Sequence, residues 1–221
     1  MGASLTLSRP ELPREFIAGH KRRRMMDAMA ELCAEQGYEA TKIADIVRRA
    51  GVARKTLYDN FDGKEDLFLA AFTTAQRELK MEVDAACAES EGVWQKRVEA
   101  GLAAILGFFA ARPAVAKMCM VEALSATPAA SARYDAAVEE LVEMLRRNTP
   151  AESGLPGTIE ETLVGGVAWI LNQQIRRGEA SQVMDLLPEL SEFVLSPYHG
   201  VAQLGSQPGG ESDSTVTDSN T

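Results

Sequence analysis

The sequence is poor in the residues that metal sites, disulfides and most active sites require. It holds 3 cysteines and 2 histidines in 221 residues. Cys33, Cys87 and Cys119 fit no metal-binding or disulfide spacing and lie at apolar helix positions, so we expect reduced thiols. His20 and His199 are far apart in the chain, with no cysteine or carboxylate cluster near either. We therefore predict no metal, no cofactor and no catalytic residue, and an enzyme is the most remote of the possible functions.

Long hydrophobic runs are also missing. No apolar stretch approaches the roughly 20 residues that a membrane-spanning helix needs, and the N-terminus lacks the charged-then-apolar order of a signal peptide. The 46% hydrophobic and 25% charged content is ordinary for a globular protein. No β-strand alternation is present. These absences predict an all-α protein of the cytoplasm that does not associate with membranes.

Positive charge is scarce and unevenly placed. The formal net charge is −9. Residues 1–65 hold 12 Lys and Arg against 10 Asp and Glu, whereas residues 66–221 hold 11 against 22. A basic run, Lys21 to Arg24, lies in the first part; it is either a set of phosphate contacts or a solvated helix face. The acidic remainder discourages nonspecific adhesion to nucleic acid outside the N-terminal part.

The stretch from Thr41 to Leu67 reads as a helix-turn-helix followed directly by another helix. One face of the first short helix is apolar, with residues spaced i, i+3, i+4 and i+7: Ile43, Ile46, Val47 and Ala50. Thr41 is placed to cap this helix, and Gly51 tolerates a left-handed C-terminal turn. The second short helix turns Leu57 and Phe61 inward. Its outward side chains can form hydrogen bonds in a major groove: Arg54, Lys55, Thr56, Tyr58 and Asn60.

This stretch resembles the TetR family of bacterial transcriptional regulators. The resemblance is carried by Thr41, by Ala50-Gly51-Val52 and by the run Thr-Leu-Tyr-x-x-Phe-x-x-Lys-Glu-x-Leu between Thr56 and Leu67. It covers about Arg22 to Phe72, roughly a quarter of the chain. The resemblance implies an N-terminal three-helix DNA-binding domain, a helical ligand-binding and dimerisation domain, and a homodimer on double-stranded operator DNA.

The resemblance also implies roles for single residues on DNA. Thr41 and Lys64 would bind phosphates, Arg54 and Lys55 would reach base edges, and Thr56 and Tyr58 would contact a phosphate or a base. Taken singly, each has a simpler interpretation as a cap, a solvated charge or a rim aromatic. Two positions depart from the family pattern. Ala53 replaces the usual Ser or Thr cap, at a cost of about 1 kcal/mol, and Asn60 stands where His is common, where it would pair with adenine or cap a helix.

The rest of the chain predicts amphipathic helices separated by proline and glycine. We expect an arm at 1–13, the helix-turn-helix domain at 14–62, the effector-binding and dimerisation domain at 63–200, and a disordered tail at 201–221. The expected helices are Arg14–Gln36, one from Leu67 to about Ala86, Val93–Ala111, Pro113–Leu124, Ala129–Arg147, Thr158–Arg177 and Ser181–Leu195. Pro188 predicts a kink or a restart in the last of these.

Two groups of residues in the second domain are candidates for further sites. An effector cavity between helices would be lined by large side chains, although such stripes are more often plain core: Trp94, Phe108, Phe109, Met118, Trp169 and Asn172. The last helix carries an apolar stripe that no later element covers, and with a glycine suited to close helix approach it predicts a dimer interface: Gly165, Leu186, Leu187, Leu190, Phe193 and Val194.

The sequence therefore predicts a ligand-responsive transcriptional regulator. The resemblance implies a repressor that leaves its inverted-repeat operator when a small apolar effector binds. The alternative is a helix-turn-helix regulator controlled by a protein partner or by cysteine oxidation.

Overall fold

Helices make up all the regular structure of residues 14–150 and 154–204, apart from residue 91, which are the residues described by the computed structural model. The all-α prediction is thereby confirmed. The predicted arm at 1–13 and residues 205–221 of the predicted tail lie outside the described residues, whereas residues 201–204, also predicted as tail, belong to the last helix. The helices are α1 (Arg14–Gln36), α2 (Ile43–Ala50), α3 (Arg54–Tyr58), α4 (Lys64–Glu89), α5 (Trp94–Ala111), α6 (Pro113–Met120), α7 (Pro128–Asn148), α8 (Ile159–Arg176) and α9 (Leu187–Leu204), with 3-10 turns η1 (Glu122–Leu124) and η2 (Ala180–Leu186).

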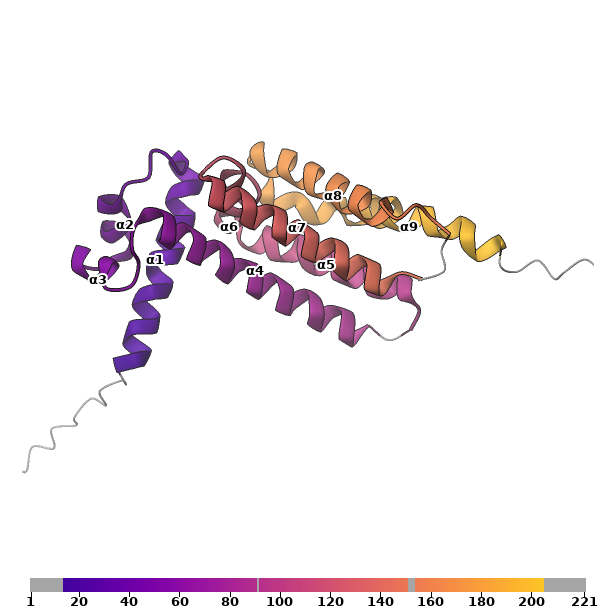
Figure 1. The fold of residues 1–221 in the computed structure, drawn as a ribbon, viewed down its shortest axis with the longest axis horizontal. Coiled ribbons are helices and arrows are strands. Elements are labelled where there is room, and N and C mark those ends of the chain that lie inside the picture. Colours follow the sequence, from indigo (N-terminus) through magenta and orange to yellow (C-terminus); the bar gives the residue numbers. More distant parts are fainter. Residues whose placement is uncertain (1–13, 91, 151–153, 205–221) are drawn as a thin grey trace, which may run out of the picture.

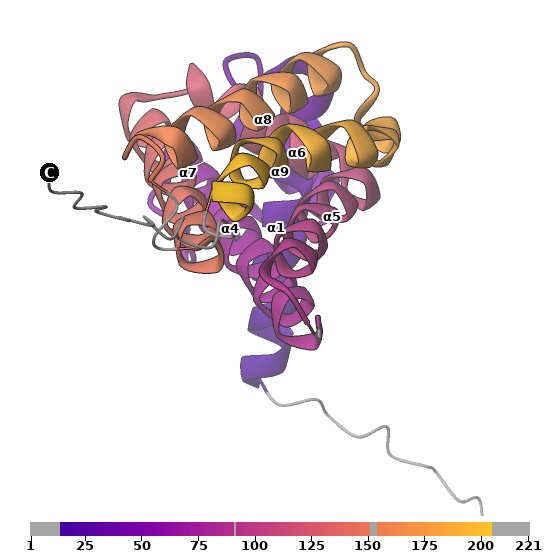
Figure 2. The same ribbon diagram turned by 90° about the vertical axis from the view of Figure 1, so that its right-hand side faces the viewer.

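The molecule consists of a small head and a larger helical body (Figure 1). Helices α1, α2 and α3 gather at one end, and α4 runs from this head along the body. The far part of α4 packs against α5 and α7, and α8 and α9 lie on the opposite side of the body from α4 (Figure 1). Helices α8 and α9 lie side by side in both views (Figures 1 and 2) and contact each other. α4 is thus the one long element that both parts share.

One continuous apolar core joins the head to the body. In the first half of α4, Leu67, Phe68 and Phe72 are buried, and the Phe68 ring meets the Tyr38 ring edge-on at 5.0 Å between centroids. In the second half, Val83 is buried against the body. Because α4 contributes buried residues to both the head and the body, the two parts of the molecule cannot move independently without disturbing shared packing.

Helix ends follow the local chemistry with two exceptions. The last segment does restart at Pro188: η2 ends at Leu186 and α9 begins at Leu187, which places the proline in the first turn where its missing N–H costs nothing. However, α9 continues to Leu204, well beyond the expected end at Leu195. The expectation that Thr41 caps α2 is wrong, since Lys42 is the N-cap and its side chain makes no capping hydrogen bond.

No single helix in the described ranges is long and apolar enough to cross a membrane. α5 together with the segment Pro113–Leu124 passes the length and composition criteria only as a pair, and the two are bent by 109°.

Replacing Phe68 by alanine should destabilise the whole molecule. The ring is fully buried where α4 meets α1, and deletion of a buried phenyl group typically costs about 3–5 kcal/mol of unfolding free energy. Urea unfolding followed by circular dichroism measures the change. Met81→Ala is the matched control on the same helix, because Met81 is 66% exposed and its loss should cost no more than about 0.5 kcal/mol. Equal effects of the two substitutions would contradict the shared core.

Candidate functional site: a helix-turn-helix surface and an apolar cavity

The turn between α2 and α3 depends on Gly51. This residue has φ 59° and ψ 43°, in the left-handed region, and its N–H donates to the carbonyl of Arg48. A Cβ on Gly51 would also lie 2.5 Å from Nη2 of Arg24, so the flexible arginine side chain would have to move. Buried Ile46 and Leu57 then pack the two short helices against the rest of the head. The predicted helix-turn-helix is therefore present.

Three of the predicted DNA-contacting residues share an exposed face of α3. Arg54, Lys55 and Tyr58 are all exposed, and the Arg54 guanidinium lies 5.7 Å from the centroid of the Tyr58 ring. Nη2 of Arg54 is 3.4 Å from the Tyr58 hydroxyl. Thr56 lies between them in sequence and is half-buried. This face combines two cations with an aromatic ring, which suits contacts to base edges and phosphates.

Three other predicted DNA contacts are turned toward the protein. Thr41 is only 1% exposed and its hydroxyl donates to the carbonyl of Gly37 at 2.8 Å. The Asn60 amide donates to the Thr56 carbonyl at 2.8 Å and so caps the end of α3. Lys64 donates to the Tyr38 carbonyl at 3.1 Å, with its Nζ 4.0 Å from the centroid of the Tyr38 ring. In this structure these side chains hold the head together.

Lys42 is a candidate that the sequence did not single out. It is exposed and occupies the N-cap position of α2. The N-terminal end of a helix attracts phosphate through its free N–H groups and its dipole. The sequence does place a lysine directly after Thr41. Because Thr41 was expected to be the N-cap, Lys42 was not considered for that position.

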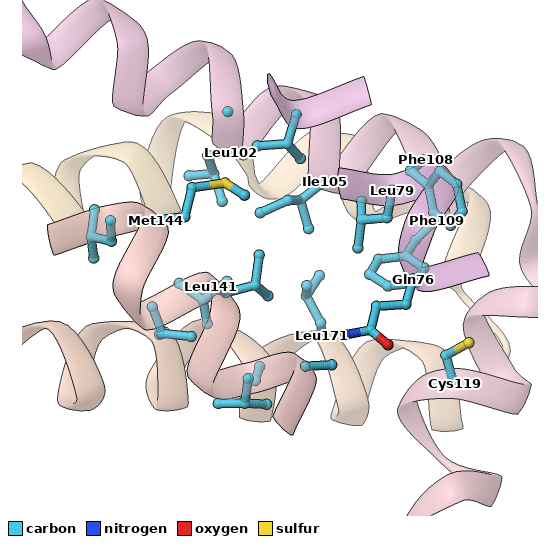
Figure 3. A pocket seen from close by; sticks show the side chains of 18 of the residues that line it. Gln76, Leu79, Leu102, Ile105, Phe108, Phe109, Cys119, Leu141, Met144 and Leu171 are labelled. Carbon is cyan, nitrogen blue, oxygen red and sulfur yellow. The ribbon is translucent and has the colours of Figure 1, made fainter. Parts of the chain in front are cut away.

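An apolar cavity of about 140 Å³ lies inside the body (Figure 3). Its walls come from helices α4 to α9, and nearly all the lining atoms are apolar. Side chains from four of these helices surround the space in Figure 3, among them Leu79, Leu102, Ile105, Leu141, Met144 and Leu171. Gln76 on α4 is one of the few polar residues of the wall, and its Nε2 donates to Glu140 of α7 at 3.1 Å.

Only two of the six predicted effector residues line this cavity, namely Phe108 and Phe109. Trp94 instead packs edge-on against Tyr198, with centroids 5.3 Å apart. Met118 is fully buried on a different face of α6. The reason for both errors is helix phase, which spacing along an almost wholly apolar segment does not determine.

The remaining two predicted effector residues lie outside the cavity on α8. Trp169 is 65% exposed on the outer face of this helix. Asn172 is buried, and its Nδ2 donates to the carbonyl of Met120 at the end of α6. Both border a separate surface hollow between α7 and α8. Sequence reasoning missed the cavity residues of α4 and α7, whose apolar stripes gave no sign of facing each other.

The predicted dimer stripe is largely covered by the chain itself. Leu190 and Val194 are buried in the subunit's own core, and Leu186 and Leu187 are half-buried against it. The premise that nothing covers this stripe is therefore wrong. Phe193 remains 39% exposed.

Two glycines on α8 mark where its outer face meets α9. A Cβ on Gly166 would lie 3.0 Å from the Phe193 ring, so this glycine lets α9 approach α8 within one subunit. Gly165 is exposed on the outer face, one turn before Trp169. An exposed surface of Gly165, Trp169 and Phe193 therefore remains, which we call the α8–α9 face.

Within the described ranges, no three His, Cys, Asp or Glu side chains are grouped closely enough to hold a metal ion. The buried pair of α8 and α9 is structural: the Tyr198 hydroxyl donates to Glu160 at 3.0 Å. Burial and this hydrogen bond raise the pKa of Tyr198 to about 12, so the phenol stays protonated and continues to donate.

The three cysteines are shielded to different degrees. Burial raises the pKa of the Cys119 thiol to about 12. Burial, reinforced by the charge of Glu122, raises the pKa of Cys33 to about 12 as well. Cys87 is half-buried, and its pKa is also raised, chiefly by burial. Since the thiolate is the form that reacts, these shifts make all three thiols poor nucleophiles at neutral pH.

Three helices, a glycine turn and an exposed basic helix make the head a helix-turn-helix DNA-binding domain in architecture. Residues 25–71 match the sequence model of the family described as bacterial regulatory proteins, tetR family. This match covers the head alone, which is therefore a helix-turn-helix of the TetR type.

Curated relatives share mainly this head. The regulator YezE of Bacillus subtilis is 46% identical over 41 residues, which are 19% of this chain and 21% of that protein. The fatty acid metabolism regulator protein of Bacillus subtilis is 40% identical over 48 residues, 22% of this chain and 25% of that protein. The matches thus span well under two thirds of the relatives' lengths.

Solved structures share the whole fold. The fatty acid degradation regulator FadR of Bacillus halodurans superposes with a TM-score of 0.72, at 16% identity, over 85% of this chain and 97% of that chain. FadR of Bacillus subtilis in complex with stearoyl-CoA superposes with a TM-score of 0.70, at 17% identity, over 79% and 98%. At these identities the likeness establishes a common fold.

The cysteines should differ in reactivity according to their burial. In the folded protein at pH 8, iodoacetamide should modify Cys87 first and leave Cys33 and Cys119 intact, because a thiol of pKa about 12 is ionised in only about one molecule in ten thousand. Mass spectrometry of quenched samples measures the order. In concentrated guanidinium all three should react at similar rates. Equal rates for Cys119 in folded and unfolded protein would contradict its placement.

Proposed function

We propose that this chain is a repressor that binds an inverted-repeat operator as a homodimer and leaves it when a small apolar ligand enters the body. The observation that carries the proposal is the apolar cavity beside α4, the helix that continues into the head. A protein that only binds DNA needs no such cavity. A cavity on the helix that sets the position of the head gives a ligand a direct means of acting on DNA binding.

The head supports the DNA-binding part of the proposal. Arg54, Lys55 and Tyr58 occupy the exposed face of α3, and Lys42 lies exposed at the start of α2. Arg54 and Lys55 would reach base edges in the major groove. Lys42 and Tyr58 would contact phosphates. In the wider charge pattern, only the N-terminal part of the chain is basic on balance.

The cavity supports an apolar ligand with a long chain. Its walls offer methyl, methylene and ring surfaces and almost no hydrogen-bonding groups, so a polar ligand would lose its hydration without compensation. Two FadR proteins share the fold, and one of them is described in complex with stearoyl-CoA. We therefore infer a fatty acyl group as the ligand class.

The size of the cavity supplies the switch. A void of about 140 Å³ is smaller than the roughly 300–1,000 Å³ of typical ligand pockets. A long acyl chain therefore binds only if neighbouring helices separate. Helix α7 is tied to α4 by the exposed hydrogen bonds Arg133 to Thr73, at 2.6 Å, and Gln76 to Glu140. A ligand that binds well only in the expanded form shifts the population toward that form.

Helix α6 offers a route from the cavity to the head. Its last residues, Cys119 and Met120, line the cavity. Two residues later, Glu122 accepts a hydrogen bond from the backbone N–H of Tyr38 at 2.7 Å.

The same end of α1 has further polar contacts. Lys117 of α6 donates to the carbonyl of Ala34 at 2.7 Å, and Lys64 of α4 is bound to the carbonyl of Tyr38. Displacement of α6 by a ligand would shift the hydrogen bonds that Lys117 and Glu122 form at the end of α1. Through Tyr38 it would also shift the start of α4. This arrangement is the coupling that an effector needs.

The α8–α9 face supports a homodimer. Trp169 and Phe193 are exposed large hydrophobic residues on adjacent helices, and Gly165 permits close approach beside them. Under two-fold symmetry the same face would meet its copy. Trp169 also borders the surface hollow between α7 and α8, which a partner's side chain could fill. An inverted-repeat operator matches a two-fold protein.

Control by cysteine oxidation is the weaker alternative. Cys33 and Cys119 are buried with raised pKa values, and the Cys87 pKa is raised too. Redox-sensing cysteines are typically accessible and have lowered pKa values. The environments of these thiols therefore favour packing over sensing.

The test of the function combines DNA selection with ligand titration. The dimer should select an inverted repeat from random DNA and lose on the order of 10³-fold affinity between about 50 and 200 mM salt, because several phosphates are contacted. Arg54→Ala should relax the preference at particular base positions and weaken binding by about 10-fold or more. Arg147→Ala is the matched control, an exposed cation at the end of α7 that should have no effect.

The ligand arm uses stearoyl-CoA and free fatty acids of increasing chain length. Calorimetric titration measures binding, because neither tryptophan lines the cavity, and a fluorescent operator reports release. We expect the tightest ligand to weaken operator binding by about 100-fold, which corresponds to about 2.7 kcal/mol of coupling. A ligand that binds equally well with and without operator would show that ligand binding does not affect DNA binding, which would contradict the proposal.

The dimer should be disrupted by charges on the α8–α9 face. The double substitution Trp169→Glu with Phe193→Glu places two carboxylates at exposed positions, so each subunit should fold while the dimer dissociates. Sedimentation equilibrium measures the state of association. Met81→Glu, which changes an exposed methionine of α4, is the control and should remain dimeric. If the double variant stays dimeric with its helix content unchanged, the interface lies elsewhere.

A further inference from the structure

Three consecutive arginines of α1 contact α4 and the residues that follow α2 and α3. Arg22 donates to the carbonyl of Asn60, directly after α3, at 2.8 Å. Arg23 is paired with Glu78 of α4. Arg24 donates to the carbonyl of Gly51, which ends α2, at 3.3 Å. Successive side chains on a helix point about 100° apart, so neighbouring residues can serve different partners.

Arg22 has the most specific of these contacts. Its guanidinium carbon lies 4.1 Å from the centroid of the buried Phe61 ring, while one of its N–H groups donates to Asn60. The planar guanidinium stacks on the ring and donates from its edge at the same time. A lysine ammonium is a point charge that cannot reproduce this pair of contacts.

Arg22 anchors a helix that has little stability of its own. α3 has only five residues, and its N-cap residue Ala53 forms no capping hydrogen bond. A helix this short is unstable without tertiary anchors. Leu57 anchors its inner face, and the Asn60 amide caps its end at Thr56. Arg22 then ties that end to α1.

We infer that Arg22 is a positioning residue for DNA reading: it sets the orientation of α3 through Asn60 and Phe61, in place of the phosphate contact that the basic run suggested. The inference rests on the proposed DNA-binding function. If α3 tilts, Arg54, Lys55 and Tyr58 lose their alignment with base edges. Contacts between the head and the DNA backbone are less sensitive to such a tilt.

The experiment compares Arg22→Lys with wild type on two DNA duplexes. One is the sequence that wild-type protein selects from random DNA, and the other is a scrambled duplex of equal length. Dissociation constants are measured from about 50 to 200 mM salt. Arg22→Lys keeps the charge, so a phosphate contact would survive the change. We expect the preference for the selected sequence to fall at least 10-fold, with unchanged affinity and salt dependence on the scrambled duplex.

Two further variants separate positioning from other roles. Phe61→Leu removes the ring beneath the guanidinium and leaves the Arg22 charge, and it should reduce the preference in the same way. Lys21→Ala removes the adjacent exposed cation of α1 and should leave the preference unchanged. Thermal unfolding measures the melting temperature of each variant. The titrations are made well below it, so that every variant is folded.

The outcomes are distinct. Unchanged preference in both Arg22→Lys and Phe61→Leu overturns the inference, even if both variants melt at lower temperature, since Arg22 would then be purely structural. Equal loss of affinity on both duplexes, with a shallower salt dependence in Arg22→Lys, assigns Arg22 to a phosphate and also overturns it. If wild-type protein selects no sequence at all, the proposed DNA-binding function fails first, and the inference fails with it.

Discussion

The rest of the structure depends on α4 being one uninterrupted helix. Its first half, through Leu67, Phe68 and Phe72, belongs to the core of the head. Its second half, through Leu79 and Val83, forms a wall of the cavity. A stiff helix buried at both ends transmits a change at one end as a tilt at the other, because close-packed interfaces shift between arrangements and do not deform smoothly. Under the proposed function, the head therefore needs no ligand contact of its own to respond to a ligand in the body.

The head was predictable from sequence because its determinants are local. Ile46, Ala50, Leu57 and Phe61 lie within one short stretch, and the turn between their helices depends on the backbone freedom of Gly51. The exposed face of α3 follows directly from the inward direction of Leu57. Most helix starts were predictable for the same reason, including the restart at Pro188, where a proline imposes its own geometry, but the end of α9 at Leu204 was not.

The cavity and the body surface were not predictable to the same depth. Helices α5, α8 and α9 are apolar over much of their circumference, so spacing alone leaves open which residues face a void, a neighbour or solvent. Leu190 and Phe193 looked equivalent in sequence, yet one is buried in the subunit and the other exposed. The contacts of polar residues were not predictable for a related reason. Thr41, Asn60 and Lys64 find partners in backbone carbonyls that the fold brings near. Arg22 and Arg24 also donate to carbonyls, and Arg23 pairs with Glu78.

The unfilled space among α4, α5, α7 and α8 has a consequence for how the protein tolerates substitution. A void forfeits dispersion contacts that a filled core would have, so the folded state carries a packing defect. Substitutions that enlarge a lining side chain, for instance at Ala137, would repair the defect and raise the melting temperature. They would do so by occupying the volume that the proposed ligand would enter. Thermal stability and response to the proposed ligand are thus opposed in this fold. Laboratory selection for a higher melting temperature should yield variants that are stable but no longer respond to the ligand.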